Sequence, residues 1–104
     1  MSELPKTTRQ LQRADAAEVA AKMVRGGQTH ANIWPEAGRV RVEFHTPDGV
    51  QHSTVPVTEL RRHLAGLFLA SAPGYSMWSP PGIPKEVERQ LRQVTLDLRA
   101  WAEA

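Results

Sequence analysis

Three stretches of the chain repeat apolar residues at the spacing of an α-helix. The first runs from Thr7 or Thr8 to Arg25 and is rich in alanine, the residue with the highest helix propensity. The second covers residues 59–71 and the third covers residues 84–102. The pattern therefore predicts one helix near the start of the sequence and two helices in its second half.

The interval between the first two helices has the alternation of β-strands. Residues 39–45 place valine and phenylalanine on one face and charged residues or histidine on the other. Residues 30–34 and 50–55 flank this strand, and the intervening segments 35–38 and 46–49 contain the proline and glycine of tight turns. We therefore expect a three-stranded antiparallel meander.

The turn before the third strand leaves the register of that strand open. A type I turn with a glycine bulge places His52 beside Phe44, whereas a two-residue turn made by Asp48 and Gly49 pairs His52 with His45. A slip of one residue exchanges the two faces of the strand. The sequence therefore does not determine the face on which His52 lies.

Together these elements predict an α+β fold: a helix, a three-stranded antiparallel meander and two further helices, with the helices in a single layer on one sheet face. We expect one domain over residues 1–104, with a flexible N-terminus at residues 1–6 and a proline-rich aromatic loop at residues 72–83. The expected core residues are Val19, Met23, Val40, Val42, Phe44, Leu60, Leu64, Leu67, Phe68, Val87, Leu91, Val94 and Leu98.

The third helix has the pattern of an association surface. Its apolar positions are spaced alternately four and three residues apart, which is the rhythm of a helix that packs along a partner helix. These positions are Val87, Leu91, Val94, Leu98 and Trp101. They pack either within the domain or against the same helix of a second copy. We expect the second arrangement, a homodimer with this seam at its interface.

The composition excludes several kinds of chemistry. The 104 residues include no cysteine, which rules out disulfides, Fe–S clusters and cysteine nucleophiles. The serines stand outside the known nucleophile motifs, and no glycine-rich phosphate loop follows a predicted strand. The histidines lack the spacing of metal ligands, and a site at His45 and His52 depends on the hairpin bringing them together. We therefore expect a protein that is not an enzyme and binds no metal or cofactor.

Membrane contact and secretion are not expected either. The longest purely apolar run, residues 67–70, is much shorter than the roughly 20 residues needed to cross a bilayer. Residues 1–6 lack the apolar segment of a signal peptide. These two observations predict a cytoplasmic protein.

The segment 72–83 is unusual because it combines large apolar side chains with prolines and glycines. Such a loop presents apolar anchors at a low cost in conformational entropy, as protein interfaces require. Our first hypothesis is therefore a small regulatory, accessory or inhibitory protein that binds another protein through Tyr75, Met77 and Trp78.

Arginine supports an alternative hypothesis, that of a nucleic-acid-binding regulator. The net charge is only +2 with a pI of about 9.5, but ten of the thirteen basic residues are arginine, which binds phosphate in a bidentate manner. Arg61 and Arg62 open the second helix, where basic side chains oppose the helix macrodipole. The candidate phosphate contacts are Arg39, Arg41, Arg61 and Arg62, joined by Arg9 and Arg13 of the first helix.

The order of helix, three strands and helix resembles that of double-stranded-RNA-binding domains. In that family, basic residues that open the second helix contact phosphates across a groove. The resemblance extends to the order of elements only, because Arg61-Arg62-His63 stands where the family carries a lysine-rich run. It implies phosphate contacts by the arginines at the start of the second helix.

Overall fold

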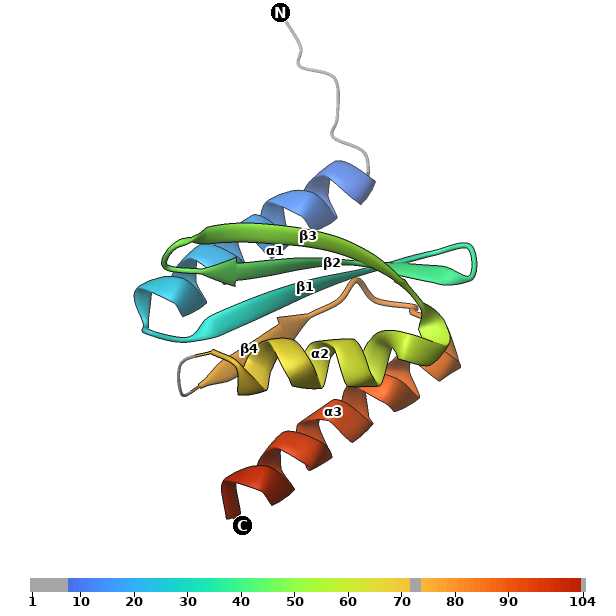
Figure 1. Cartoon of the computed structure of the whole chain (residues 1–104). Helices are drawn as coiled ribbons and strands as arrows, with labels where there is room; N and C mark the ends of the chain where they lie inside the picture. The colour runs from blue at the N-terminus through green and yellow to red at the C-terminus, as the bar shows by residue number, and fades with distance from the viewer. Residues whose placement is uncertain (1–7, 72–73, 104) are drawn as a thin grey trace, which may run out of the picture.

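The computed structural model describes residues 8–71 and 74–103, so the expected flexible segment 1–6 lies outside the described residues. Its elements in chain order are α1 (Thr8–Arg25), β1 (Thr29–Glu36), β2 (Arg39–Thr46), β3 (Gly49–Pro56), the short 3-10 turn η1 (Val57–Glu59), α2 (Leu60–Leu69), β4 (Tyr75–Trp78) and α3 (Lys85–Glu103) (Figure 1). The α+β class and the predicted order of helices and strands are confirmed.

The sheet contains one strand more than the sequence pattern predicts. Its strand order is β3-β2-β1-β4, with antiparallel pairs among β1, β2 and β3 and a parallel pair between β1 and β4. The segment 72–83 is therefore not a continuous loop, because Tyr75–Trp78 forms β4. A strand of four residues between proline-rich and glycine-rich stretches is too short to show a recognisable alternation.

The hairpin between β2 and β3 adopts neither of the two expected registers. Thr46 pairs with Gly49, so His45 stands opposite Val50 and His52 stands opposite Glu43. The side chain of Thr46 stabilises the turn, because its Oγ1 accepts a hydrogen bond from the backbone N–H of Asp48 at 3.2 Å. His45 and His52 consequently share one face of the sheet without being cross-strand partners.

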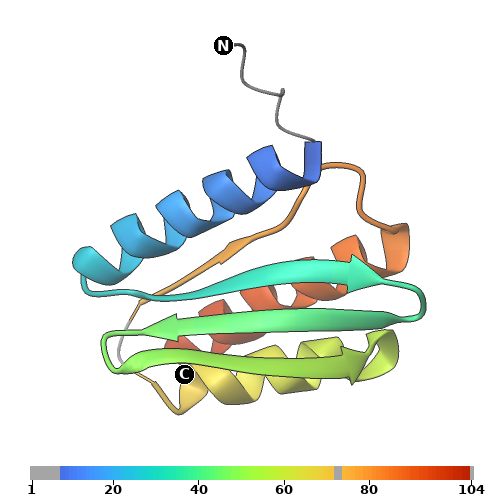
Figure 2. The same cartoon turned by 90° about the horizontal axis from the view of Figure 1, so that it is seen from above.

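The helices cover both faces of the sheet, which differs from the single layer expected (Figure 1). We call the two faces the α1 face and the α2–α3 face. On the α1 face, the side-chain amide of Asn32 in β1 donates to the backbone carbonyl of Ala16 at 3.2 Å. The central strand β1 is buried from Thr29 to Trp34 on both of its faces, so it needs a cover on each side. Figure 2 shows α1 along the β1–β4 side of the sheet and β3 at the opposite margin.

The hydrophobic core lies on the α2–α3 face. Its buried residues are Ala31, Ile33, Val40, Val42, Phe44, Leu60, Leu64, Phe68, Val87, Val94 and Leu98, with Leu67 and Leu91 packed against them. The predicted core residues of β2, α2 and α3 are thus confirmed. Val19 and Met23 are half-buried residues of α1 and stand apart from this core. Within the described residues, no helix combines the length and the apolar character needed to span a membrane.

The predicted seam of α3 packs within the chain. Val87, Val94 and Leu98 are buried in the core, and Leu91 packs against it. Trp101 differs from the other four positions because 64% of its surface is exposed. The 4-3-4-3 spacing is therefore accounted for by packing against α2 and the sheet, up to the last turn of the helix.

Candidate functional site

Four arginines lie on the α1 face, and we call them the arginine cluster: Arg9, Arg13, Arg39 and Arg41. Arg9 and Arg13 are four residues apart on α1, a spacing that places them on one side of the helix. Arg39 and Arg41 are two residues apart on β2 and therefore share one face of the strand. The helix and the strand thus bring two pairs of guanidinium groups to one side of the sheet.

The indole of Trp34 lies under α1 at the centre of this cluster. The Cζ atoms of Arg9 and Arg13 lie 4.6 Å and 5.0 Å from the centre of its ring, within the range of cation–π contacts. Trp78 of β4 packs against the same indole with ring centres 5.1 Å apart. Trp34 is only 1% exposed, so it serves as a platform that positions the two arginines.

Arg41 stands directly opposite Trp34 in the pairing of β1 with β2. Its Nε and one of its terminal nitrogens are buried and have no hydrogen-bond partner within the described residues. A buried N–H of a charged group that has no partner is costly, because it has lost its water without gaining an acceptor. These two nitrogens are enclosed, so an anion could act as their acceptor only if the neighbouring side chains moved aside.

The carboxylates near the cluster do not neutralise it. Glu43 accepts a hydrogen bond from the indole N–H of Trp34, and its other oxygen lies 3.8 Å from Nδ1 of His52. No ion pair joins any of the four arginines to an acidic side chain in residues 8–71 and 74–103. Glu36 stands opposite Arg39 in the pairing of β1 with β2 without forming an ion pair, so the four arginines share this face with two carboxylates, Glu36 and Glu43, and keep an excess of positive charge.

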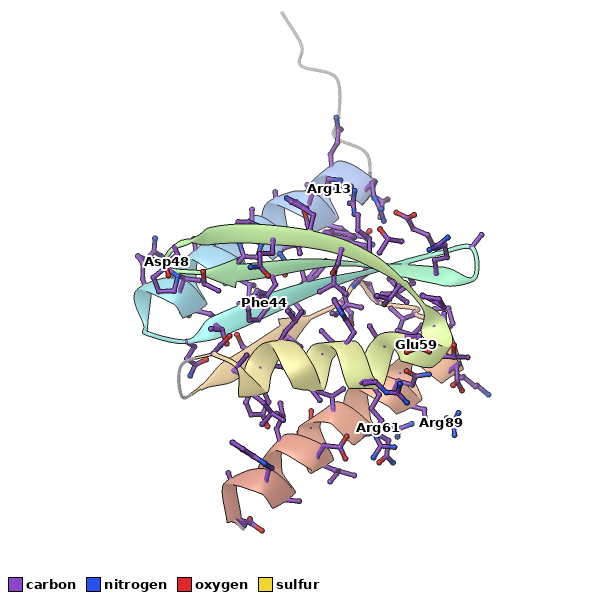
Figure 3. All side chains as sticks on the ribbon, in the orientation of Figure 1. Arg13, Phe44, Asp48, Glu59, Arg61 and Arg89 are labelled. Atoms are coloured by element: carbon purple, nitrogen blue, oxygen red, sulfur yellow. The ribbon has the colours of Figure 1, made fainter. Side chains whose placement is uncertain are left out.

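The arginines outside the cluster contrast with those inside it. Arg61 donates two hydrogen bonds to Asp97, at 2.7 and 2.8 Å, and this contact lowers the pKa of that carboxyl. Arg62 lies 4.0 Å from Glu59. Both belong to α2, across the sheet from the cluster, as the labels of Arg13 and Arg61 in Figure 3 show. The four arginines chosen from the sequence therefore form two separate pairs, of which only Arg39 and Arg41 lie in the cluster.

The three predicted protein-binding anchors do not form one surface either. Tyr75 and Met77 pack against the core on the α2–α3 face, whereas Trp78 contacts Trp34 on the α1 face. This division follows from the alternation of side chains along β4. All three residues are half-buried.

A chain of buried hydrogen bonds crosses the α1 face beside the arginine cluster. The carbonyl of Ala16 can only accept, so the amide nitrogen of Asn32 faces it and Oδ1 of Asn32 faces His30. Nε2 of His30 therefore carries the proton and donates to that oxygen at 2.7 Å. Nδ1 of His30 is then an acceptor 2.7 Å from the hydroxyl of Ser76, whose single proton is shared with the carbonyl of Thr29 at 3.2 Å.

We interpret this Ser76–His30–Asn32 chain as structural. A serine, a histidine and an amide in this order have the donor pattern of a nucleophile, its base and an orienting group. However, His30 is 0% exposed, so no substrate could reach it without displacing α1. What the chain does accomplish is to tie α1, β1 and β4 together. Sequence patterns gave no signal for it, because His30 and Asn32 resemble solvent-facing residues of an alternating strand.

Acidification is expected to destabilise the fold through one buried and two half-buried histidines. Burial lowers the pKa values of His30, His45 and His63 below their ordinary value of 6.5. At pH values below 6.5 the histidines of the unfolded chain bind more protons than those of the folded chain. The contribution of these histidines to the free energy of unfolding is therefore fully present above pH 6.5 and declines as the pH falls. Each histidine contributes a slope of at most about 1.4 kcal/mol per pH unit.

Urea unfolding at neutral and mildly acidic pH measures this effect. Asp97 and Glu86 do not interfere, because their pKa values are held below ordinary values of 3.8 and 4.5 and their contribution is lost only at lower pH. The prediction would be contradicted if the free energy of unfolding stayed constant or rose as the pH was lowered from neutral to just below 6.5.

A second surface feature lies at the C-terminal ends of α2 and α3. A pocket of about 540 Å³ opens there, and its apolar lining includes Phe68, Leu69, Tyr75, Leu98 and Trp101. Tyr75 borders this pocket together with Trp101, the exposed end of the predicted seam, whereas Met77 and Trp78 line a separate pocket of about 260 Å³ with Leu91. In the described part of the chain, no three histidine or acidic side chains form a group that could hold a metal ion.

Comparison with known protein-family models, curated proteins and solved structures yields no significant match to the chain.

Proposed function

We propose that this chain is a non-enzymatic protein that binds the phosphate backbone of nucleic acid on its α1 face. The observation that carries the proposal is the arginine cluster, whose four guanidinium groups have no carboxylate partner among the described residues. Arg41 adds two buried nitrogens that lack an acceptor. Phosphate oxygens are strong acceptors and match the planar geometry of guanidinium.

The arrangement of the cluster favours a polyanion over a small anion. Arg9 and Arg13 approach from the helix and Arg39 and Arg41 from the strand, so the positive charge is spread over two elements. Beside them the β2–β3 half of the α1 face is open, with Val50, His52 and Thr54 exposed. A chain of phosphates can follow this face, whereas a single phosphate would meet only part of it.

The same face predicts how selective the binding is. Base recognition in single strands relies on exposed aromatic rings, but Trp34 is 1% exposed and is covered by Arg9 and Arg13. We therefore expect contacts to the backbone rather than to the bases, a strong dependence on salt and little preference for sequence.

Removing two cluster arginines tests the proposal. In Arg13→Gln with Arg39→Gln, both positions are exposed and Arg9 still stacks on Trp34, so the fold is expected to be kept while two phosphate contacts are lost. The slope of log K against log salt should become shallower by about 1.4–1.8, from about 0.7–0.9 per contact. Fluorescence anisotropy with labelled single-stranded and duplex oligonucleotides of mixed sequence measures this slope.

The matched control removes the same charge from α3. In Arg89→Gln with Arg92→Gln, both side chains are exposed and both pair with glutamates of their own helix. This variant should bind as the wild type does. Equal losses in the two variants, or no salt-dependent binding by the wild type, would overturn the proposal. The hypothesis of a protein partner bound through Tyr75, Met77 and Trp78 stays a prediction, and it has less support because these side chains are divided between two faces.

A further inference from the structure

The strand β3 forms an open edge of the sheet. It is the terminal strand in the order β3-β2-β1-β4 and is eight residues long. Figure 2 shows it at the margin of the sheet opposite α1. Residues 49–52 are all exposed, and 46% of the surface of Val50 is accessible. An edge of this length offers a row of backbone groups to another strand.

The register identifies the backbone groups that face outward. Thr46 and Gly49 close a two-residue hairpin, so residues 49, 51, 53 and 55 direct their N–H and C=O groups toward β2. Residues 50, 52 and 54 then direct theirs away from the sheet. Pro56 agrees with this assignment, because proline has no N–H and fits a strand only where none is needed for pairing.

This edge lacks the features that normally prevent strand pairing. Soluble proteins protect such edges with charged side chains, prolines, bulges or short strands. From Gly49 to Pro56 the strand contains no lysine, arginine, aspartate or glutamate, and its only proline is the last residue. The other edge is protected, because β4 has four residues and is followed shortly by Pro80 and Pro81.

We propose that β3 pairs antiparallel with β3 of a second copy of this chain, so that two copies share one continuous sheet. A second copy fits because two such strands bring no acidic or lysine or arginine side chains into opposition. The arrangement is two-fold and buries the same patch on both copies. It stops at two copies, because the protected β4 edge cannot propagate the sheet.

The two-fold axis of such a pair is perpendicular to the sheet, so both α1 faces lie on the same side. Two arginine clusters would then line one surface of the dimer. This geometry follows from the antiparallel pairing alone and does not rest on the proposed nucleic-acid binding. Self-association is measured without any nucleic acid, so failure of either proposal leaves the other open to its own test.

One substitution removes an outward N–H without changing the pairing of β2 with β3. His52→Pro deletes the N–H of an exposed residue that stands opposite Glu43 in the non-bonded position. His52→Ala is the matched control, because it removes the side chain and keeps the N–H. Sedimentation equilibrium over a range of protein concentrations should find the wild type and His52→Ala dimeric, and His52→Pro monomeric at the concentrations where they dimerise.

A second pair of variants guards against misfolding of the proline variant. Gln51→Lys keeps the backbone and places a positive charge on the edge of each copy at an exposed residue opposite Phe44, whereas Gln51→Asn adds none. Gln51→Lys should lose the dimer and Gln51→Asn should retain it, with unchanged far-UV circular dichroism in both. The proposal is overturned if the wild type is monomeric at every concentration. A monomeric wild type whose β3 pairs with an extended segment of another protein would overturn it as well. It is also overturned if the folded His52→Pro and Gln51→Lys variants dimerise as the wild type does.

Discussion

Trp34→Ala is expected to lower the free energy of unfolding by about 3–5 kcal/mol, the range found when a buried tryptophan is truncated. Trp34 is 1% exposed in the middle of β1. Its removal would leave a cavity beside Trp78 and take away the ring on which Arg9 and Arg13 rest. Glu43 would also lose the indole N–H that it accepts.

Chemical denaturation followed by circular dichroism measures the loss. Trp101→Ala is the matched control, because it is the same substitution at a side chain that is 64% exposed, and it should change stability by no more than about 0.5 kcal/mol. Trp34→Phe retains an aromatic ring and should fall between the two. If Trp34→Ala cost no more than Trp101→Ala, Trp34 would not be the platform that joins α1 to the sheet.

Asn32→Leu is expected to cost about 2–4 kcal/mol, although leucine is apolar and similar in size. The amide of Asn32 connects the backbone of Ala16 with Nε2 of His30, and its nitrogen lies 3.4 Å from Nε2 of His45. Leucine would leave the buried polar atoms of His30 without one of their partners. The cost arises from these unmatched groups rather than from lost volume.

Urea unfolding of a graded pair of variants separates this effect from packing. Ser76→Ala removes only the hydroxyl at the half-buried end of the same chain and should cost about 0.5–1.5 kcal/mol. The loss in Asn32→Leu should clearly exceed it. A leucine variant as stable as the wild type would mean that apolar packing can replace the network, as it does for some buried ion pairs.

The sequence was most informative where only one face of an element is buried. The strand β2 and the helices α2 and α3 each bury a single face, so their apolar periodicity predicted both the element and its core residues. The strand β1 is buried on both faces, which removes the alternation that would have marked its full extent. The side of the sheet taken by α1 could not be predicted, because Ala16 and Ala20 mark its buried stripe with little hydrophobic contrast.

Local periodicity also predicted part of the candidate site, but not the part that depends on tertiary structure. Alternation alone places Arg39 and Arg41 on one strand face. Their convergence with Arg9 depends on how α1 docks, which is a tertiary property. The pairing of Arg61 with Asp97 spans 36 positions of the chain and has no local signature, so the sequence could not show that this arginine is already engaged.

The way in which α1 is attached has a consequence for how the molecule responds to a ligand. Small alanines, one amide and two stacked guanidinium groups hold α1 in place, whereas the large apolar core lies on the other side of the sheet. The helix can therefore open separately from the rest of the fold, in a local unfolding unit of its own. A polyanion that contacts the arginines of α1 and those of β2 at the same time would hold the helix against the sheet. Binding of the polyanion and docking of α1 on the sheet would then be linked equilibria. The bound polyanion would stabilise the docked helix, and opening of the helix would weaken binding of the polyanion.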